Sequence, residues 1–333
     1  MEPVRIALIG AGDWGEKHLQ ALKTLRNVQV SAICEPNAER ARRLAEQYRI
    51  EHVYSDFNEL LAREQLDAIH VATPEQLHRE PVVEAARHGL HILVEKPIAT
   101  TLEDADAMIQ AAQKENVFLM VGHILRWDAR YAMVKDAIER GEVGEIGAVF
   151  ARRAFSRAGA STYLPRVTPL MQSAIHDIDL ILWYTKDRVS ETYARSAKLL
   201  NYTNPDITTC LLSLEKGAQA VLEHSFTLPE RIPFMTGARM EIIGSNSFVI
   251  IDASEQCLFF CDQNGWRTPD TTLIPVVRNS LMGTLKEEIS YFVRCVANGE
   301  NPSVITPEEA REALRVALSC EQSLAEGRPI RLS

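Results

Sequence analysis

The sequence has few of the features that mark specialised classes of protein. Six of its 333 residues are cysteine, and no two of them form a C-x-x-C pair, which argues against a zinc ribbon or a thioredoxin-type site. The formal net charge is −9, whereas a nucleic-acid-binding surface usually shows an excess of basic residues. No apolar run approaches the ~20 residues of a membrane span, and the N-terminus does not resemble a signal peptide. These absences predict a cytoplasmic protein that binds neither nucleic acid nor membrane.

The composition is that of an ordinary globular protein. Hydrophobic residues make up 46% of the chain and charged residues 24%, and the length favours about two domains. Cys257 and Cys261 are predicted to lie on one face of a strand, as two thiols in the core.

The N-terminal third alternates short apolar runs with amphipathic stretches. This alternation is typical of right-handed βαβ units and a parallel sheet. The predicted strands are Val4–Ile9, Val28–Cys34, Ala68–Ala72, Ile92–Val94 and Val117–Val121, and the predicted helices are Glu16–Leu25, Ala38–Tyr48, Phe57–Arg63, Glu80–His88 and Leu102–Glu115. Asn37 and Asp56 are predicted helix caps. The fold class is therefore α/β, with an N-terminal Rossmann dinucleotide-binding domain over residues 1–122.

The pattern changes after Gly122. Strand-like runs now dominate, and where polar and apolar residues alternate, as in 218–228, they indicate a half-buried, mostly antiparallel sheet. The predicted strands are Ile146–Phe155, Val189–Lys198, Ile207–Leu214, Gln219–Leu228, Arg239–Ile243, Phe248–Asp252 and Cys257–Cys261, and the predicted helices are Asp128–Arg140, Met171–Trp183, Gly283–Ala297 and Pro307–Ala325. We predict that residues 123–333 form a C-terminal α+β domain with a large open sheet, which binds substrate and mediates oligomerisation.

A glycine-rich stretch, "LIGAGDWGEKH" (residues 8–18), follows the first predicted strand. Its glycines have the spacing G-x-G-x-x-G and open a helix, which is the context that a dinucleotide pyrophosphate requires. The helix N-terminus offers unpaired N–H groups and a positive dipole to phosphates. The predicted contacts in this stretch come from Gly10, Gly12, Asp13, Trp14 and Gly15.

Glu35 lies 20 residues beyond Gly15, at the end of the second predicted strand. An acid there can accept hydrogen bonds from the adenine ribose and would repel a 2′-phosphate. The sequence therefore favours NAD over NADP as the cofactor. NADP stays possible because three arginines, Arg40, Arg42 and Arg43, lie close by.

Two further segments follow strands at the edge of the sheet where such domains bind ligands. "VATPEQLH" (71–78) contributes Thr73, Pro74 and His78 as predicted cofactor contacts, although Thr73 fits equally well as a helix cap. "LVEKPIAT" (93–100) contributes Glu95, Lys96 and Pro97. Lys96 could orient a substrate hydroxyl or transfer a proton, and a cis peptide at Pro97 could fix its direction. An ordinary strand–turn with a surface ion pair is the alternative.

The helix "QSAIHDIDLILWY" (172–184) is the second candidate for chemistry. Gln172, His176 and Asp179 share one helical face, and histidine titrates in the range needed to remove a hydroxyl proton. A structural histidine is the alternative. No third ligand has the spacing of a metal site, so we predict no metal.

With "GAGDWG", "ATPEQLH", "VEKP" and "IHDIDL" in this order, the chain resembles the Gfo/Idh/MocA family of NAD(P)-dependent oxidoreductases, nearly end to end. The resemblance implies that Lys96 contacts substrate and nicotinamide and that His176 is a catalytic acid/base. It implies substrate contacts from Asp179 and Arg126. It also implies a sugar, nucleotide sugar or cyclitol as substrate, and a homodimer or homotetramer formed through the C-terminal sheet.

One departure from the family's pattern concerns Gln172. Inositol-dehydrogenase-like members often carry an aspartate there, four residues before the histidine, and glutamine cannot stabilise an imidazolium by charge. Either Lys96 takes the proton or the substrate is not inositol. The main hypothesis is a dehydrogenase that acts on a secondary alcohol; the alternatives are redox-assisted glycoside cleavage on tightly held NAD and a non-catalytic NAD-binding sensor.

Overall fold

The computed structural model describes residues 2–230, 232, 236–254, 258–263 and 265–332. The chain divides into two compact units. The first contains residues 1–127 and 272–311, and the second contains residues 128–271 and 312–333. We describe each unit by itself.

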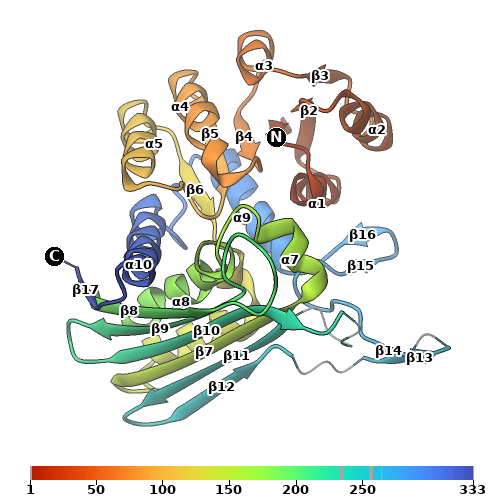
Figure 1. Ribbon diagram of the computed structural model, residues 1–333. Helices are drawn as coiled ribbons and strands as arrows, with labels where there is room; N and C mark the ends of the chain where they lie inside the picture. The colour runs from red at the N-terminus through yellow and green to blue at the C-terminus, as the bar shows by residue number, and fades with distance from the viewer. Residues whose placement is uncertain (1, 231, 233–235, 255–257, 264, 333) are drawn as a thin grey trace. The chain divides into compact units, whose positions relative to one another are not determined.

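The first unit is built on a six-stranded parallel sheet with the order β3-β2-β1-β4-β5-β6 (Figure 1). This is the strand order of a Rossmann fold, and its right-handed crossovers place helices on both faces. The strands are β1 (Val4–Ile9), β2 (Val28–Cys34), β3 (His52–Tyr54), β4 (Ala68–Val71), β5 (His91–Glu95) and β6 (Leu119–Gly122). The α-helices between them are α1 (Asp13–Leu22), α2 (Ala38–Tyr48), α3 (Phe57–Arg63), α4 (Arg79–Arg87) and α5 (Leu102–Lys114).

The five predicted strands of this sheet and the predicted helices are confirmed, with ends shifted by a few residues. The edge strand β3 was not predicted, because three residues are too few to show a period. Asn37 and Asp56 cap α2 and α3: the Asn37 side chain accepts from Arg40 N, and Asp56 accepts from Asn58 N and Glu59 N. The core between sheet and helices is apolar, with buried Leu8, Leu19, Ile33 and Leu44 among its members.

The predicted domain limits differ from the observed units in two places. The short helix η2 (Ile124–Trp127) stays with the first unit rather than starting the second. The segment 272–311, which carries α9 (Thr284–Asn298), also belongs to the first unit, because α9 packs on α1, β1 and η2. Its buried side chains Leu285, Ile289 and Phe292 supply the apolar face that holds it there.

The second unit contains a seven-stranded sheet with the order β12-β11-β7-β10-β9-β8-β17. Its strands are β7 (Ile146–Ser156), β8 (Val189–Ala197), β9 (Ile207–Leu214), β10 (Gln219–Leu228), β11 (Thr236–Gly244), β12 (Phe248–Asp252) and β17 (Ile330–Arg331). Every adjacent pair is antiparallel except β7 with β10, which is parallel. The predicted large, mostly antiparallel sheet is thus confirmed.

The helices of this unit are α6 (Ala129–Glu139), α7 (Arg157–Tyr163), η3 (Leu170–Ala174), α8 (Ile175–Thr185) and α10 (Pro307–Glu326). The element η3 is a π-helical turn that continues directly into α8. The boundary between the two units falls within α10. Within this unit, α8 and α10 lie over one face of the sheet (Figure 1). The helix α7 was not predicted. Its residue Ala160 and the C-cap Leu164 pack on Phe226 of the sheet, so tertiary contacts rather than a strong local pattern define it.

Two short hairpins follow the sheet, β13 (Phe260–Asp262) with β14 (Gly265–Arg267) and β15 (Val276–Val277) with β16 (Ser280–Leu281). The predicted strand 257–261 reduces to the start of β13. The prediction that Cys261 is a core thiol is wrong, because this residue is exposed on the hairpin. Cys257, its predicted partner, lies outside the described residues.

Candidate functional site

The glycine loop joins β1 to α1 and has the geometry of a dinucleotide cradle. Gly10 has φ +88°, and a Cβ there would lie 2.7 Å from the Thr73 nitrogen. A Cβ on Gly15 would lie 2.1 Å from the Gly10 carbonyl oxygen. These two glycines are needed by the protein's own packing. A Cβ on Gly12 would meet no protein atom within 4 Å, so the backbone at Gly12 borders open space, as the approach of a pyrophosphate requires.

Glu35, the predicted ribose-binding acid, is 7% exposed and lies where β2 ends. Its Oε2 accepts a hydrogen bond from the Ala11 N–H at 3.0 Å, and its Oε1 accepts from Asn37 N at 2.9 Å. These bonds tie the end of β2 to the glycine loop. Arg40 Nη1 is 3.7 Å from the same carboxylate, so the nearest arginine is ion-paired with the acid.

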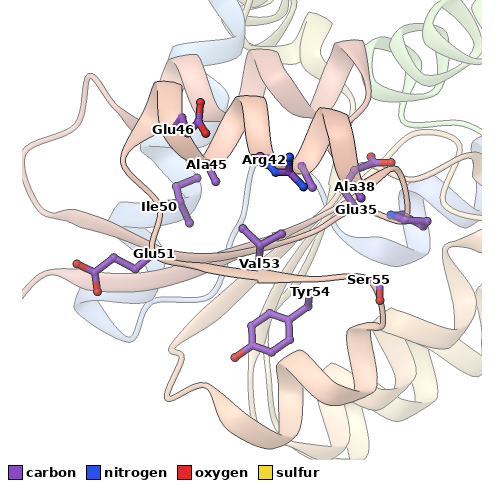
Figure 2. A pocket seen from close by; sticks show the side chains of 12 residues that line it. Glu35, Ala38, Arg42, Ala45, Glu46, Ile50, Glu51, Val53, Tyr54 and Ser55 are labelled. Atoms are coloured by element: carbon purple, nitrogen blue, oxygen red, sulfur yellow. The ribbon is translucent and has the colours of Figure 1, made fainter.

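A pocket of about 480 Å³ adjoins Glu35 and runs between α2 and β3 (Figure 2). Arg42 lines it, while the third arginine of this helix, Arg43, pairs with Glu16 at 2.9 Å. The other lining residues include Ala38, Ala45, Ile50, Val53, Tyr54 and Ser55. The pocket therefore lies beside the acid that we predicted for the adenine ribose and extends along β3.

His78 connects the two loops that follow β4 and β5. Its Nε2 lies 3.0 Å from the Thr73 carbonyl oxygen, and its Nδ1 lies 3.1 Å from that of Pro97 and 3.2 Å from that of Ile98. Burial lowers the pKa of His78, and hydrogen bonds to the carbonyls of Thr73 and Ile98 oppose part of this shift. Both nitrogens face carbonyl oxygens of the chain, so His78 holds the loop that carries Lys96 against the loop after β4. A cofactor contact from His78 stays a prediction.

The segment "EKP" stands at the carboxyl end of β5. The Lys96–Pro97 peptide bond is cis, as predicted. Lys96 is half-buried, whereas the Glu95 carboxylate turns inward. Glu95 Oε1 accepts a hydrogen bond from His18 Nε2 at 2.9 Å, and its Oε2 accepts from the Lys96 backbone N–H at 3.3 Å. Lys96 is thus presented by a turn that is fixed from two sides.

Arg126 is buried in the first unit, on η2. Its Nη1 donates to the Val304 carbonyl at 2.7 Å and to Glu309 Oε2 at 3.0 Å. The same Glu309 oxygen accepts from Thr306 N, while Glu309 N donates to Thr306 Oγ1, which is the reciprocal capping box at the start of a helix. These contacts connect Arg126 to the start of α10; a substrate contact from this residue stays a prediction.

In the second unit, the predicted catalytic helix begins with the π-helical turn η3 (Leu170–Ala174). Single π-turns inside α-helices are frequently found at functional sites. Gln172 and His176 are half-buried while the other residues of 170–181 are buried. These two side chains are thus the more exposed of the three predicted residues, whereas Asp179 is only 1% exposed. A common substrate-binding face for all three stays a prediction.

Next to His176, Asp177 is the centre of a buried ionic network. Arg153 of β7 binds it with two hydrogen bonds, of 2.7 and 3.2 Å, and His224 Nε2 of β10 lies 3.2 Å from its Oδ2. Burial alone would raise the pKa of Asp177, but Arg153 and His224 lower it to about 2. His224 Nδ1 also lies 2.8 Å from Ser173 Oγ of η3. The network anchors both the π-turn and the start of α8 to the sheet.

Sequence reasoning gave no role to His18, Arg153, Asp177 or His224. One signal could have found His224, which interrupts an otherwise apolar face of its strand. The others carry no local pattern, because their partners lie 24 to 77 residues away. Among the described residues, no group of three His, Cys, Asp or Glu side chains could hold a metal ion. No described helix is long and apolar enough to cross a membrane.

Comparisons with known proteins agree with these features. Residues 4–123 match the family described as "Oxidoreductase family, NAD-binding Rossmann fold", and residues 131–249 match "GFO/IDH/MocA C-terminal domain". A myo-inositol 2-dehydrogenase of Thermotoga maritima is 27% identical over 99% of this chain and 98% of its own. An inositol 2-dehydrogenase of Acidothermus cellulolyticus is 30% identical over 76% of this chain and 74% of its own.

A crystal structure of scyllo-inositol dehydrogenase from Lactobacillus casei, with bound cofactor NAD(H) and scyllo-inositol, has the same fold. Its TM-score is 0.85 at 19% identity, and the match covers 99% of each chain. The glycine cradle, the end-to-end relatives and the two family matches lead to one conclusion: the chain belongs to the Gfo/Idh/MocA family and is an NAD-dependent dehydrogenase.

Proposed function

We propose that the enzyme transfers a hydride between a secondary alcohol of a sugar, nucleotide sugar or cyclitol and the nicotinamide of NAD. The turn of Lys96 carries this proposal, because it presents a half-buried lysine directly after β5, at the carboxyl edge of the sheet, where such sheets bind their ligands. The names of two relatives, both dehydrogenases of inositols, support the substrate class.

Bound NAD supplies the hydride acceptor, and the chain supplies positioning and proton handling. We propose that the ammonium group of Lys96 donates a hydrogen bond to the reacting hydroxyl and that His176 exchanges its proton. Gln172, at the other end of the same accessible helix face, would hydrogen-bond a further hydroxyl. Asp179 and Arg126 are assigned to substrate binding by the family resemblance alone.

The cofactor contacts are proposed from the first unit. Gly10, Gly12, Gly15 and the start of α1, with Asp13 and Trp14, hold the pyrophosphate, and Glu35 holds the adenine ribose. Thr73 and Pro74 border the loop against which Gly10 packs. The position of Glu35 supports a preference for NAD, because an acid at the end of β2 would repel a 2′-phosphate, and the nearest arginine, Arg40, is paired with this acid.

The test is a panel of polyols, sugars and nucleotide sugars, followed by the absorbance of reduced nicotinamide with NAD and NADP separately. We expect turnover of at least one secondary alcohol with NAD, and loss of this turnover in Lys96→Ala with NAD binding retained. Lys114→Ala, at a lysine whose side chain is 82% exposed, is the matched control. Near-normal turnover of Lys96→Ala would refute the proposed role.

The same panel separates the alternative activities. Reduced nicotinamide released in proportion to product excludes redox-assisted glycoside cleavage, which regenerates its cofactor. A protein that binds NAD but stays silent across the panel would instead favour a sensor.

We also propose that copies of the chain associate through the sheet face that α8 and α10 leave uncovered. Phe150, Leu211 and Ile250 are 39 to 48% exposed on it, and pairing across β12, β11, β7, β10 and β9 places them in one cross-strand row. Phe150→Asp should lower the mass measured by light scattering; an unchanged mass would refute this surface.

A further inference from the structure

The Glu95 carboxylate lies in a niche that three elements of the first unit leave for it. Gly122 of β6 is its neighbour in the sheet, and a Cβ on Gly122 would lie 2.9 Å from Glu95 Oε1. The absence of a side chain at Gly122 therefore makes room for the acid. His18 of α1 holds Oε1 from another side, and the Lys96 N–H binds Oε2. The carboxylate is consequently fixed in orientation.

Behind this carboxylate lies a pair of fully buried imidazoles. His18 Nδ1 is 3.1 Å from His70 Nδ1 of β4, so one of the two nitrogens carries the shared proton. Burial and the neighbouring His18 hold the pKa of His70 well below its usual range. His70 is therefore neutral, and His18 lies between it and Glu95.

Glu288 of α9 is the fourth member of the cluster. It is fully buried, and neither of its carboxyl oxygens has a hydrogen-bond partner among the described residues. One helical turn further on, Phe292 packs edge-on against His70, with ring centroids 5.5 Å apart, which places this face of α9 against the imidazoles. Burial and the charge of Glu95 raise the pKa of Glu288 well above its ordinary value.

Two carboxyl groups in one dry environment do not both ionise, and the better-solvated partner keeps the charge. Here the contacts decide between them, because Glu95 accepts two hydrogen bonds and Glu288 accepts none. We propose that Glu95 is a positioning residue that keeps the neighbouring Lys96 protonated and oriented, and that Glu288 completes its buried network as an uncharged acid.

The effect on Lys96 has two parts. The hydrogen bond from its backbone N–H to Glu95 fixes the turn, and the carboxylate charge favours the ammonium form, just as Lys96 favours the ionised form of Glu95. The titratable groups that act on this carboxylate are His18 from α1, Lys96 beside it, Glu288 from α9 and His78 from the preceding loop. The inference rests on the proposed function only in making Lys96 the residue that matters for turnover.

The test measures Lys96 itself, without a substrate. The full chain is exposed to acetic anhydride at a series of pH values, and acetylation of the Lys96 peptide is quantified by mass spectrometry. In Glu95→Gln, which keeps the shape and removes the charge, we expect the midpoint of labelling to fall by about one pH unit. The peptide of exposed Lys114 is the internal control and should not move. An unchanged Lys96 midpoint in Glu95→Gln would overturn the proposal.

Glu288→Gln is the matched variant, because it removes a carboxyl that carries no charge. In Glu288→Gln, we expect the pH midpoint of Lys96 acetylation to equal that of the wild type. The infrared difference between wild type and Glu288→Gln should show the C=O band of a protonated carboxyl at neutral pH. A midpoint that falls as far as in Glu95→Gln, or a carboxylate band in place of the C=O band, would overturn the assignment of the charge.

Gly122→Ala reaches the same carboxylate by another route and covers the case that Glu95→Gln does not fold. Its Cβ must displace the Glu95 carboxyl, so the Lys96 midpoint should fall in the same direction; an unchanged midpoint would count against the proposal. If the polyol panel shows no turnover while the labelling of Lys96 changes as expected, the proposed reaction is refuted and the proposed role of Glu95 is still supported.

Discussion

Replacing Glu288 by glutamine should stabilise the protein increasingly as the pH rises. In the folded chain, burial and the charge of Glu95 raise the pKa of Glu288 well above 4.5, whereas the unfolded chain releases this proton near 4.5. Above pH 4.5 the folded state therefore binds more protons at this site than the unfolded state. The contribution of this site to the free energy of unfolding of the wild type must then fall as pH rises.

The magnitude follows from proton linkage. A difference of one bound proton changes the free energy of unfolding by about 1.4 kcal/mol per pH unit. The difference in the free energy of unfolding between Glu288→Gln and the wild type should grow at this slope from pH 4.5 up to the raised pKa of Glu288, and then stay constant. Between about pH 5 and about pH 7 this amounts to at most about 3 kcal/mol. The glutamine amide leaves as many buried polar atoms without partners as the acid does, so that cost largely cancels.

The assay is urea unfolding of both proteins at several pH values, reported by amides of the first unit through hydrogen exchange, because two units need not unfold together. Glu287→Gln is the control, since Glu287 is exposed on the same helix and is one residue away. The difference in the free energy of unfolding between Glu287→Gln and the wild type should not depend on pH. A gap for Glu288→Gln that is constant or shrinks as pH rises would refute the reasoning that this acid is buried as its protonated form.

The remaining expectations concern the cofactor loop and the anchor of α8. Gly15→Ala puts a Cβ against the Gly10 carbonyl and should lower both the unfolding temperature and NAD affinity, whereas Gly12→Ala should weaken NAD binding, measured by calorimetry, with an unchanged unfolding temperature. Equal thermal effects would contradict the roles given to these glycines. Asp177→Asn leaves Arg153 buried without its counter-charge and should cost about 3–5 kcal/mol in chemical unfolding. Because the pKa of Asp177 is lowered to about 2, this stabilisation should be present above pH 3.8 and disappear as pH falls towards 2; a cost of Asp177→Asn that stays the same at pH 2 would argue against it.

The features that could be predicted from the sequence are those that residues close together in the chain determine. Strand β1, the glycine loop and the acid at the end of β2 lie within 35 residues and have patterns of their own, so the Rossmann unit and its cofactor could be predicted. The return of α9 to the first unit could not, because an amphipathic helix shows that it has an apolar face but not which partner covers it. The exposed Cys261 illustrates the same limit, since a short apolar run fits a hairpin arm as well as a core strand.

The residues that contact cofactor and substrate stay predictions, but the contacts that hold their loops could not be predicted. The polar atoms of His78 and Glu95, which belong to two of the motifs, bond to the chain: to carbonyls at Thr73, Pro97 and Ile98, and to His18. A motif read from sequence cannot separate residues that contact a ligand from those that hold such residues, because both must lie in the same loops.

This separation has a consequence for the proposed reaction, in which Lys96 binds the substrate hydroxyl. A lysine on a flexible four-carbon stem loses considerable entropy when it is ordered at a substrate. Here the backbone that carries Lys96 is fixed beforehand, by His78 on one side of the turn and by Glu95 on the other. Only the side chain remains to be ordered on binding, which lowers the cost of reaching the reactive arrangement. The same fixed carboxylate favours the ammonium form of that side chain, so the geometry and the charge of Lys96 depend on one buried acid, and that acid depends on Gly122 having no side chain.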